Sequence, residues 1–260
     1  RSDEDAWKNL NGGINIIYRR RIFDSHSFGI SYNKNSIIDS VKFYNENFLG
    51  ENRNSHQFIS LFYNFVSDKR DSRSYPLKGS YFNFNVVKYG LGITKSNVDL
   101  INFQVQVKKF LKLKERLFLA GSLRGVVAGN NNQPYILQNG LGYSSFAIRA
   151  YELYVIDGQN IGLAKAQIRY QLVQPRVKEI PSLPKKFNRV HYAVYLGLFT
   201  DMGYVEDNTG FPLNTLANKI QYSSGIGLDF VSYYDIVIRT EFSINKFGQS
   251  GLFFHFVAPI

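Results

Sequence analysis

A strict alternation of apolar and polar side chains along many segments constrains the fold of this chain more than any other feature. In residues 98–111, for example, Phe103 and Val105 alternate with Gln104 and Gln106. A period of two places successive side chains on opposite faces of a β-strand, whereas a helix would need a period of 3.6. The alternation predicts twelve strands, near 13–22, 27–35, 38–46, 57–67, 79–90, 98–111, 115–127, 160–173, 188–204, 219–232, 234–246 and 250–260.

The polar face of these strands indicates a membrane barrel. In 160–173, Lys165, Gln167 and Arg169 share one face opposite small and apolar residues, and every predicted strand repeats this scheme. Transmembrane barrels carry apolar side chains toward lipid and polar ones toward the lumen. Hydrophobic residues make up only 44% of the chain, and no apolar run approaches the roughly 18 residues of a spanning helix. We therefore expect an all-β, antiparallel transmembrane β-barrel in the bacterial outer membrane.

Domain organisation and charge fit the same interpretation. No Pro/Gly/Ser linker divides the 260 residues, so a single domain over 1–260 is expected, with one long irregular loop at about 128–159. The formal charge is +11, but the basic residues are spread over strands and loops. Nucleic-acid binding needs clustered Lys and Arg, so it is not expected here. Anionic lipid headgroups and lipopolysaccharide are the expected partners of the basic rims.

One connection between predicted strands carries a motif of turn-forming residues: Asp68, Arg70, Asp71, Pro76 and Gly79. Aspartate side chains can bond to nearby backbone amides, proline fixes φ, and glycine permits the backbone to enter the next strand. The pattern resembles the D-x-R-D…P-x-x-G turn of the BamA/TamA surface-antigen family of outer-membrane assembly and translocation barrels. The motif indicates the family and no chemistry of its own.

The long loop contains a second motif of that family. Ile148, Arg149, Ala150 and Tyr151 resemble the V/I-R-G-F/Y signature of the loop that folds back into the barrel lumen. Ala150 stands where the family has glycine. Because alanine disfavours positive φ, a loop tip that differs slightly from the family's is expected here.

The resemblance also implies a partner for the loop arginine. In the family an acidic residue within F-x-D-x-G holds it, and this chain has Phe199, Asp201 and Gly203 in that spacing. Strand parity places Asp201 on the lumen face, and it also turns Glu241 inward. We expect Arg149 to pair with Asp201, with Glu241 as an auxiliary partner. The alternative is an exposed Arg149 and an Asp201 that faces pore water.

Strand counting gives two possible architectures. Five predicted strands follow the loop, as in the family's 16-stranded barrel, but only about seven precede it. The chain is then either a reduced 12-stranded barrel, whose first and last strands meet, or the C-terminal twelve strands of a 16-stranded one. In both cases it would be a form without POTRA domains. The last strand, with Phe254 and Phe256, resembles an assembly-signal strand, although it ends in Ile260 and not in an aromatic residue.

The resemblance implies insertion or translocation of other outer-membrane polypeptides, through a weak seam between the first and last strands. Client outer-membrane proteins, and a periplasmic partner or a homo-oligomer that recruits them, would be the protein partners. The alternatives are an anchoring, pore-forming or scaffold barrel and an outer-membrane phospholipase. The four histidines lack ligand spacing and no G-x-S-x-G elbow occurs, so no metal, cofactor or catalytic residue is expected.

Overall fold

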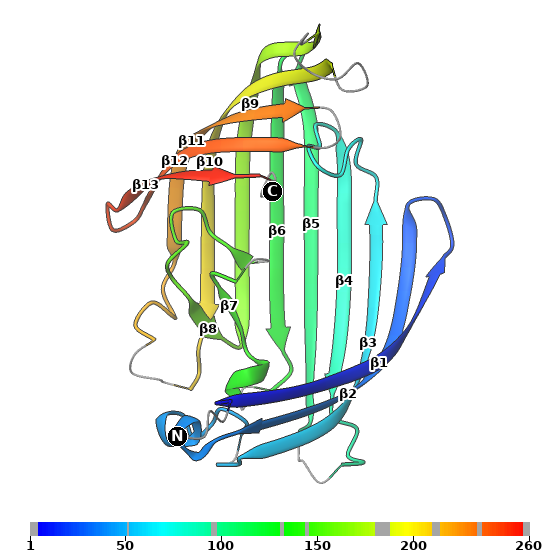
Figure 1. The fold of residues 1–260 in the computed structure, drawn as a ribbon, viewed down its shortest axis with the longest axis vertical. Helices are drawn as coiled ribbons and strands as arrows, with labels where there is room; N and C mark the ends of the chain where they lie inside the picture. Colours follow the sequence, from blue (N-terminus) through cyan, green and yellow to red (C-terminus); the bar gives the residue numbers. More distant parts are fainter. Residues whose placement is uncertain are drawn as a thin grey trace.

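Eleven long strands form one antiparallel sheet in the computed structural model (Figure 1), and each strand pairs with its neighbour in chain order. The model describes residues 5–50, 52–94, 98–130, 133–143, 146–179, 188–209, 214–232 and 236–256. The strands of the sheet are β1 (Trp7–Arg19), β2 (Asp24–Ile37), β3 (Ser55–Asp68), β4 (Gly79–Tyr89), β5 (Leu100–Lys114), β6 (Leu117–Ala128), β9 (Asn160–Glu179), β10 (Arg189–Glu206), β11 (Gln221–Ser232), β12 (Val237–Asn245) and β13 (Ser250–His255).

The two faces of the sheet are those that the alternation predicts. On β10, Leu198 and Met202 are exposed on the convex face, whereas Phe199 and Asp201 are buried on the concave face. Exposed Leu, Ile, Val and Phe side chains recur on the convex face of the other strands. A continuous apolar exterior around a polar interior is the pattern of a barrel in lipid. The predicted all-β barrel architecture is confirmed.

One predicted strand is wrong. Residues 38–46 contain the helix α1 (Asp39–Tyr44), so six strands precede the long loop and the described sheet has eleven strands where twelve were predicted. The backbone N–H groups of Val41 and Lys42 donate to the carbonyl oxygen of Ile38, which starts a helical turn. Asp39 in the first turn and Lys42 in the last complement the helix dipole. Moreover, β2 and β3 pair directly along their length, which leaves no place for a strand between them.

The connections differ in length between the two ends of the sheet. Residues 20–23 and 115–116 form short turns at one end, which we call the turn end, and residues 69–78 form a longer turn there. At the other end, the loop end, residues 38–54, 129–159 and 207–220 form long connections. Short periplasmic turns and long external loops are typical of outer-membrane barrels. No helix in the described part of the chain is long and apolar enough to cross a membrane.

The first and last strands of the sheet, which were predicted to meet, do not pair with each other in the described residues. Within the described ranges β1 pairs only with β2, and β13 pairs only with β12. Because eleven strands alternate in direction, β1 and β13 run the same way.

The long loop carries the 3-10 helix η1 (Tyr135–Leu137) and the short pair β7 (Asn139–Leu141) and β8 (Ile156–Gly158), which lie in front of the concave face in Figure 1.

Candidate functional site

The loop between β6 and β9 is packed as a small core against the concave face. Phe146, Ile148 and Tyr151 of the loop are buried, and their exposed fractions are 2–3%. They join a cluster with the strands and with the loop that follows β10; its other members are Val126, Leu141, Ile156, Ile161, Leu163, Val205 and Ala217. Burial of a Phe or Ile side chain contributes about 1.5–3 kcal/mol, so this cluster alone favours the inserted position of the loop.

Arg149 and Asp201 meet at the centre of this contact. The Arg149 Nε donates to Asp201 Oδ2 at 2.9 Å and its Nη2 donates to Oδ1 at 2.5 Å, while the backbone N–H of Arg149 also donates to Oδ2 at 3.2 Å. The two side chains are 3% and 0% exposed. A bidentate pair of this kind is strong and directional because two charge-assisted bonds fix the guanidinium plane. The structure thus brings together the two residues that the sequence pairs.

The neighbours of Asp201 on β10 explain the F-x-D-x-G spacing. The Arg149 guanidinium lies 3.6 Å from the centroid of the Phe199 ring, a cation–π contact on the same face of the strand. A Cβ at Gly203 would lie 2.4 Å from the Ile148 Cδ1, so a larger residue there would force the buried Ile148 side chain to shift. Phe199 and Asp201 therefore both contact Arg149, and Gly203 leaves space for Ile148 of the loop signature.

Ala150 keeps a left-handed backbone although it is not glycine. Its φ is +65°, a conformation that glycine adopts without a steric penalty. Its carbonyl oxygen accepts a hydrogen bond from Asn245 Nδ2 at 3.1 Å, and Tyr151 beside it donates to the carbonyl oxygen of Tyr222 at 3.3 Å. Alanine at this position thus adopts the positive φ that it ordinarily disfavours, and the expected difference from the family's tip stays a prediction. These tertiary contacts offset the strain of about 1 kcal/mol that alanine carries there.

Glu241 does not have the auxiliary role that was expected. Its carboxylate lies 3.7 Å from Arg239 Nε and 3.4 Å from His255 Nε2, and the described ion pairs of Arg149 involve Asp201 alone. Arg239 and Glu241 are two residues apart on β12 and share its inward face, and the ion pairs of Glu241 in the described residues are with Arg239 and with His255 of β13. The second charged neighbour of Asp201 is Lys165, whose Nζ is 3.6 Å from Oδ2.

The end of the loop is anchored to the connection between β10 and β11. Asn214 Nδ2 donates to the carbonyl oxygen of Asp157 at 2.8 Å and to Asp207 Oδ2 at 2.8 Å. Asp207 also accepts from the backbone N–H and the hydroxyl of Thr209 and from Gln159. Burial alone would raise the pKa of the Asp207 carboxyl, but these hydrogen bonds outweigh it and hold the pKa below its usual value.

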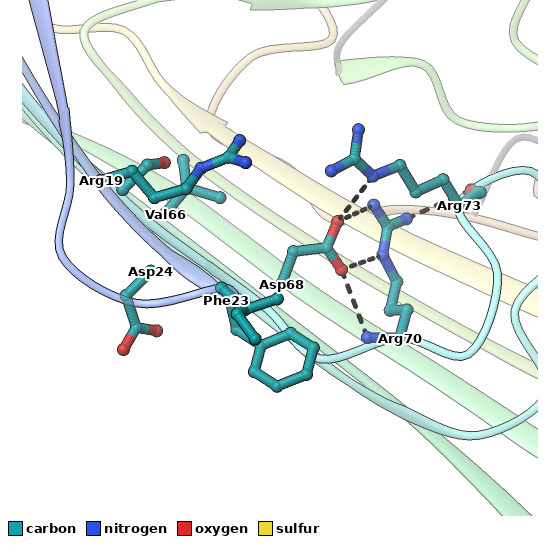
Figure 2. Close-up of a pocket in the computed structure, with 9 residues that line it drawn as sticks. Arg19, Phe23, Asp24, Val66, Asp68, Arg70 and Arg73 are labelled. Atoms are coloured by element: carbon teal, nitrogen blue, oxygen red, sulfur yellow. Dashed lines mark hydrogen bonds and ion pairs between the residues drawn. The ribbon is translucent and has the colours of Figure 1, made fainter.

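The turn motif forms the compact connection that its residues predict. Asp68 accepts two hydrogen bonds of 2.8 Å from Arg70 Nε and Nη2, and Arg73 Nε lies 3.7 Å away; Figure 2 shows this group at the turn end. Asp71 Oδ1 accepts from the N–H of Leu77 at 3.0 Å. At Gly79, φ is +103° and a Cβ would lie 2.1 Å from the Lys69 carbonyl oxygen, so glycine is required. The carbonyl oxygen of Pro76 accepts a hydrogen bond from Arg169 Nη1 at 3.0 Å.

Phe254 and Phe256, assigned to a C-terminal signal strand, are exposed, as is Leu252 on β13. Ile260 lies outside the described residues. Within the described ranges, no group of three or more His, Cys, Asp or Glu side chains is placed to hold a metal ion.

Several contacts of the site escaped sequence reasoning. Lys165 is an inward residue of β9, and its parity was visible, but which carboxylate it would face depends on the register with β10. Tyr75 sits in a turn and gave no signal of burial, yet it is buried against Asp229 of β11. Such contacts join residues more than 30 positions apart, and no local pattern encodes them.

The chain is similar to one protein-family model and to solved structures of outer-membrane proteins. The model of the Omp85 superfamily domain matches residues 1–168. BamA from Haemophilus ducreyi lacking POTRA domains 1–3 superposes with a TM-score of 0.62 and 13% identity, over 92% of this chain and 51% of that one. CdiB from Escherichia coli superposes with a TM-score of 0.55 and 10% identity, over 98% and 43%. The chain spans about half the length of these proteins. No curated protein sequence matches significantly.

Proposed function

Because the chain belongs to the Omp85 superfamily, and is an integral outer-membrane barrel like BamA and CdiB, we propose that it inserts or translocates other outer-membrane polypeptides with its long loop latched in the lumen. The latch is the pair of Arg149 and Asp201. The observation that carries the proposal is the complete burial of this bidentate pair between the loop and β10.

The proposed role of the latch is to hold the loop in one position against the concave face. A buried arginine and aspartate stabilise each other only when both are in place, because either one alone is an uncompensated charge. The loop is therefore held in a defined position or leaves it entirely. Ile148, Tyr151 and Asn245 add contacts that break at the same time. A two-position element of this kind suits a lumen that must be closed at rest and rearranged when a client is present.

Client strands would be accepted at the edge of the sheet. Each backbone hydrogen bond of a strand pair contributes only about 1 kcal/mol net, so a short seam can open and a client strand can pair with the freed edge. In this proposal the edges are those of β1 and β13. Client proteins would be recruited by a periplasmic partner or by a second copy of the chain, and lipid and lipopolysaccharide would surround the apolar convex face.

Folding of a client porin into liposomes tests the proposal. The full chain should accelerate client folding, the Arg149→Ala variant should lose most of that acceleration, and the Arg176→Ala variant, which removes an exposed arginine of β9, should keep it. If the wild-type chain gives no acceleration, the assembly role is wrong and a pore or scaffold barrel remains. An equal loss of acceleration in the two variants would show that the activity does not depend on the latch.

The proposed role involves no catalytic step. A phospholipase would need a serine and histidine pair at the lipid boundary. His255 instead contacts Glu241 on the inward face of the sheet. Phospholipid hydrolysis by the purified chain, with labelling by a serine-reactive probe, would contradict this part of the proposal.

A further inference from the structure

The turn between β3 and β4, residues 69–78, folds back over the concave face at the turn end of the sheet. Tyr75 is only 5% exposed, and its hydroxyl donates to Asp229 Oδ2 at 2.7 Å. Asp229 belongs to β11, more than 150 positions away in the sequence. The contact therefore crosses the concave face, in the same manner as the contact of the long loop at the opposite end.

Asp229 is itself held in place by the neighbouring strand. Arg239 of β12 lies directly across from it in the register and donates to both carboxylate oxygens through Nε and Nη2, the latter at 2.7 Å. Both side chains are 0% exposed. A carboxylate fixed by a bidentate arginine is a charged acceptor, and hydrogen bonds to charged groups are stronger than neutral ones. The Tyr75 hydroxyl thus has an oriented, buried anion as its partner.

A third strand holds the same turn. Arg169 of β9 donates from Nη1 to the carbonyl oxygen of Pro76 at 3.0 Å, and its guanidinium lies 4.5 Å from the centroid of the Tyr75 ring. The ring also contacts that of Tyr195, with centroids 4.9 Å apart. Four apolar side chains complete the packing around the ring: Leu77 of the same turn, Phe118 of β6, Ala193 of β10 and Val237 of β12.

Hydrogen bonds and ion pairs at the base of the turn hold it in a fixed conformation. Asp68 binds Arg70 and Arg73, as Figure 2 shows, and the N–H of Asp71 donates to the carbonyl oxygen of Lys78 at 3.1 Å. Gly79 lets the chain leave the turn at close contact with Lys69. Because the base is fixed in this way, any withdrawal of the turn from the concave face would move Tyr75 and Pro76 together.

We propose that this turn is a second closure of the lumen, at the end opposite the long loop, and that Tyr75 holds it shut by its bond to Asp229. We call it the turn lock. Passage through the lumen then requires two separate events, release of the loop and withdrawal of the turn. The inference goes beyond the proposed function, since a pore or scaffold barrel would be closed in the same way.

Cysteine labelling tests the turn lock directly, because these 260 residues contain no cysteine. The probe is Leu77→Cys, at a partly buried position of the turn. Tyr75→Phe, which removes only the hydroxyl, and Asp229→Asn should each raise the rate of maleimide labelling at this cysteine by about tenfold or more, as loss of a hydrogen bond to a charged group implies. The matched control is Tyr135→Phe, which removes a 2.7 Å bond to Asp157 within the long loop and should leave the rate unchanged.

A second probe separates local release from general loosening. Ser60→Cys places a cysteine at a buried, inward position of β3 away from the turn. An equal rise in labelling at both probes would contradict a local lock, and an unchanged rate at the Leu77→Cys probe would overturn the proposal. Single-channel recording adds a functional measurement. Because two closures act in series, the double variant Arg149→Ala/Tyr75→Phe should conduct more than the sum of the gains of the single variants. No gain over Arg149→Ala alone would also overturn the proposal.

Discussion

Replacing Arg149 with alanine should release the long loop from the concave face. The variant loses two charge-assisted hydrogen bonds of 2.9 and 2.5 Å and the contact with the Phe199 ring. It leaves Asp201 buried, with Lys165 at 3.6 Å and one backbone N–H as its remaining partners. Removing one member of a buried ion pair costs about 3–5 kcal/mol. Because Lys165 remains, we expect a loss at the lower end of this range, about 3 kcal/mol. Such a loss increases the fraction of molecules with a released loop about 100-fold.

The measurement is the rate at which a maleimide labels a single cysteine in the loop. Ala150→Cys changes little volume at a residue that is 9% exposed when the loop is docked. In this background Arg149→Ala should raise the labelling rate about 100-fold, in proportion to the released fraction. Arg149→Lys keeps the charge but loses the bidentate geometry, so it should give an intermediate rise of about tenfold.

Two comparisons decide whether the reasoning is right. Arg176→Ala, which removes an exposed arginine from the same sheet, should leave the labelling rate unchanged. If Arg149→Ala also leaves the rate unchanged while the protein remains folded, the pair does not hold the loop and the latch is refuted. If Arg149→Lys equals the wild type, charge alone suffices and the argument from bidentate geometry fails.

Three further predictions concern the loop and its anchors. Gly203→Ala should lower the free energy of unfolding by about 1–3 kcal/mol, since its Cβ would lie 2.4 Å from Ile148, and an unchanged urea midpoint would contradict this. Ala150→Gly should raise the free energy of unfolding by about 1 kcal/mol or less, because φ at this position is +65° and glycine adopts it without strain, and a lower thermal midpoint would contradict this. The lowered pKa of Asp207 means that its carboxylate stabilises the fold above the unfolded pKa of about 3.9 and that this contribution disappears as the pH falls through the folded pKa. Asp207→Asn should therefore destabilise the protein at pH 7 and show a flatter acid limb in unfolding experiments, and parallel acid limbs would contradict the assignment.

The elements of this fold were predictable to different degrees. The long strands were, because the period of two extends over many residues and no helix shares it. The helix in segment 38–46 was not predictable, because the apolar residues Val41 and Phe43 are too few to distinguish a strand from a helix. The direct pairing of β2 with β3 leaves no place for a strand there. The inward direction of Asp201 followed from its position on the strand. The partners of Glu241, which are Arg239 on the same strand and His255 on β13, did not follow from such a pattern.

The alternation along each strand was enough to assign the side chains that face lipid and those that face the interior, because it is a local property of the strand. The turn and loop motifs could also be located from the residues alone, and their resemblance to the family's motifs implied the pairing of Arg149 with Asp201. By contrast, the positions of Lys165 as the second cation at Asp201 and of Tyr75 against Asp229 became known from the folded chain alone. These contacts depend on strand register and on how two inserted segments share one concave face. Both are set by the packing of residues far apart in the chain, which no local pattern contains.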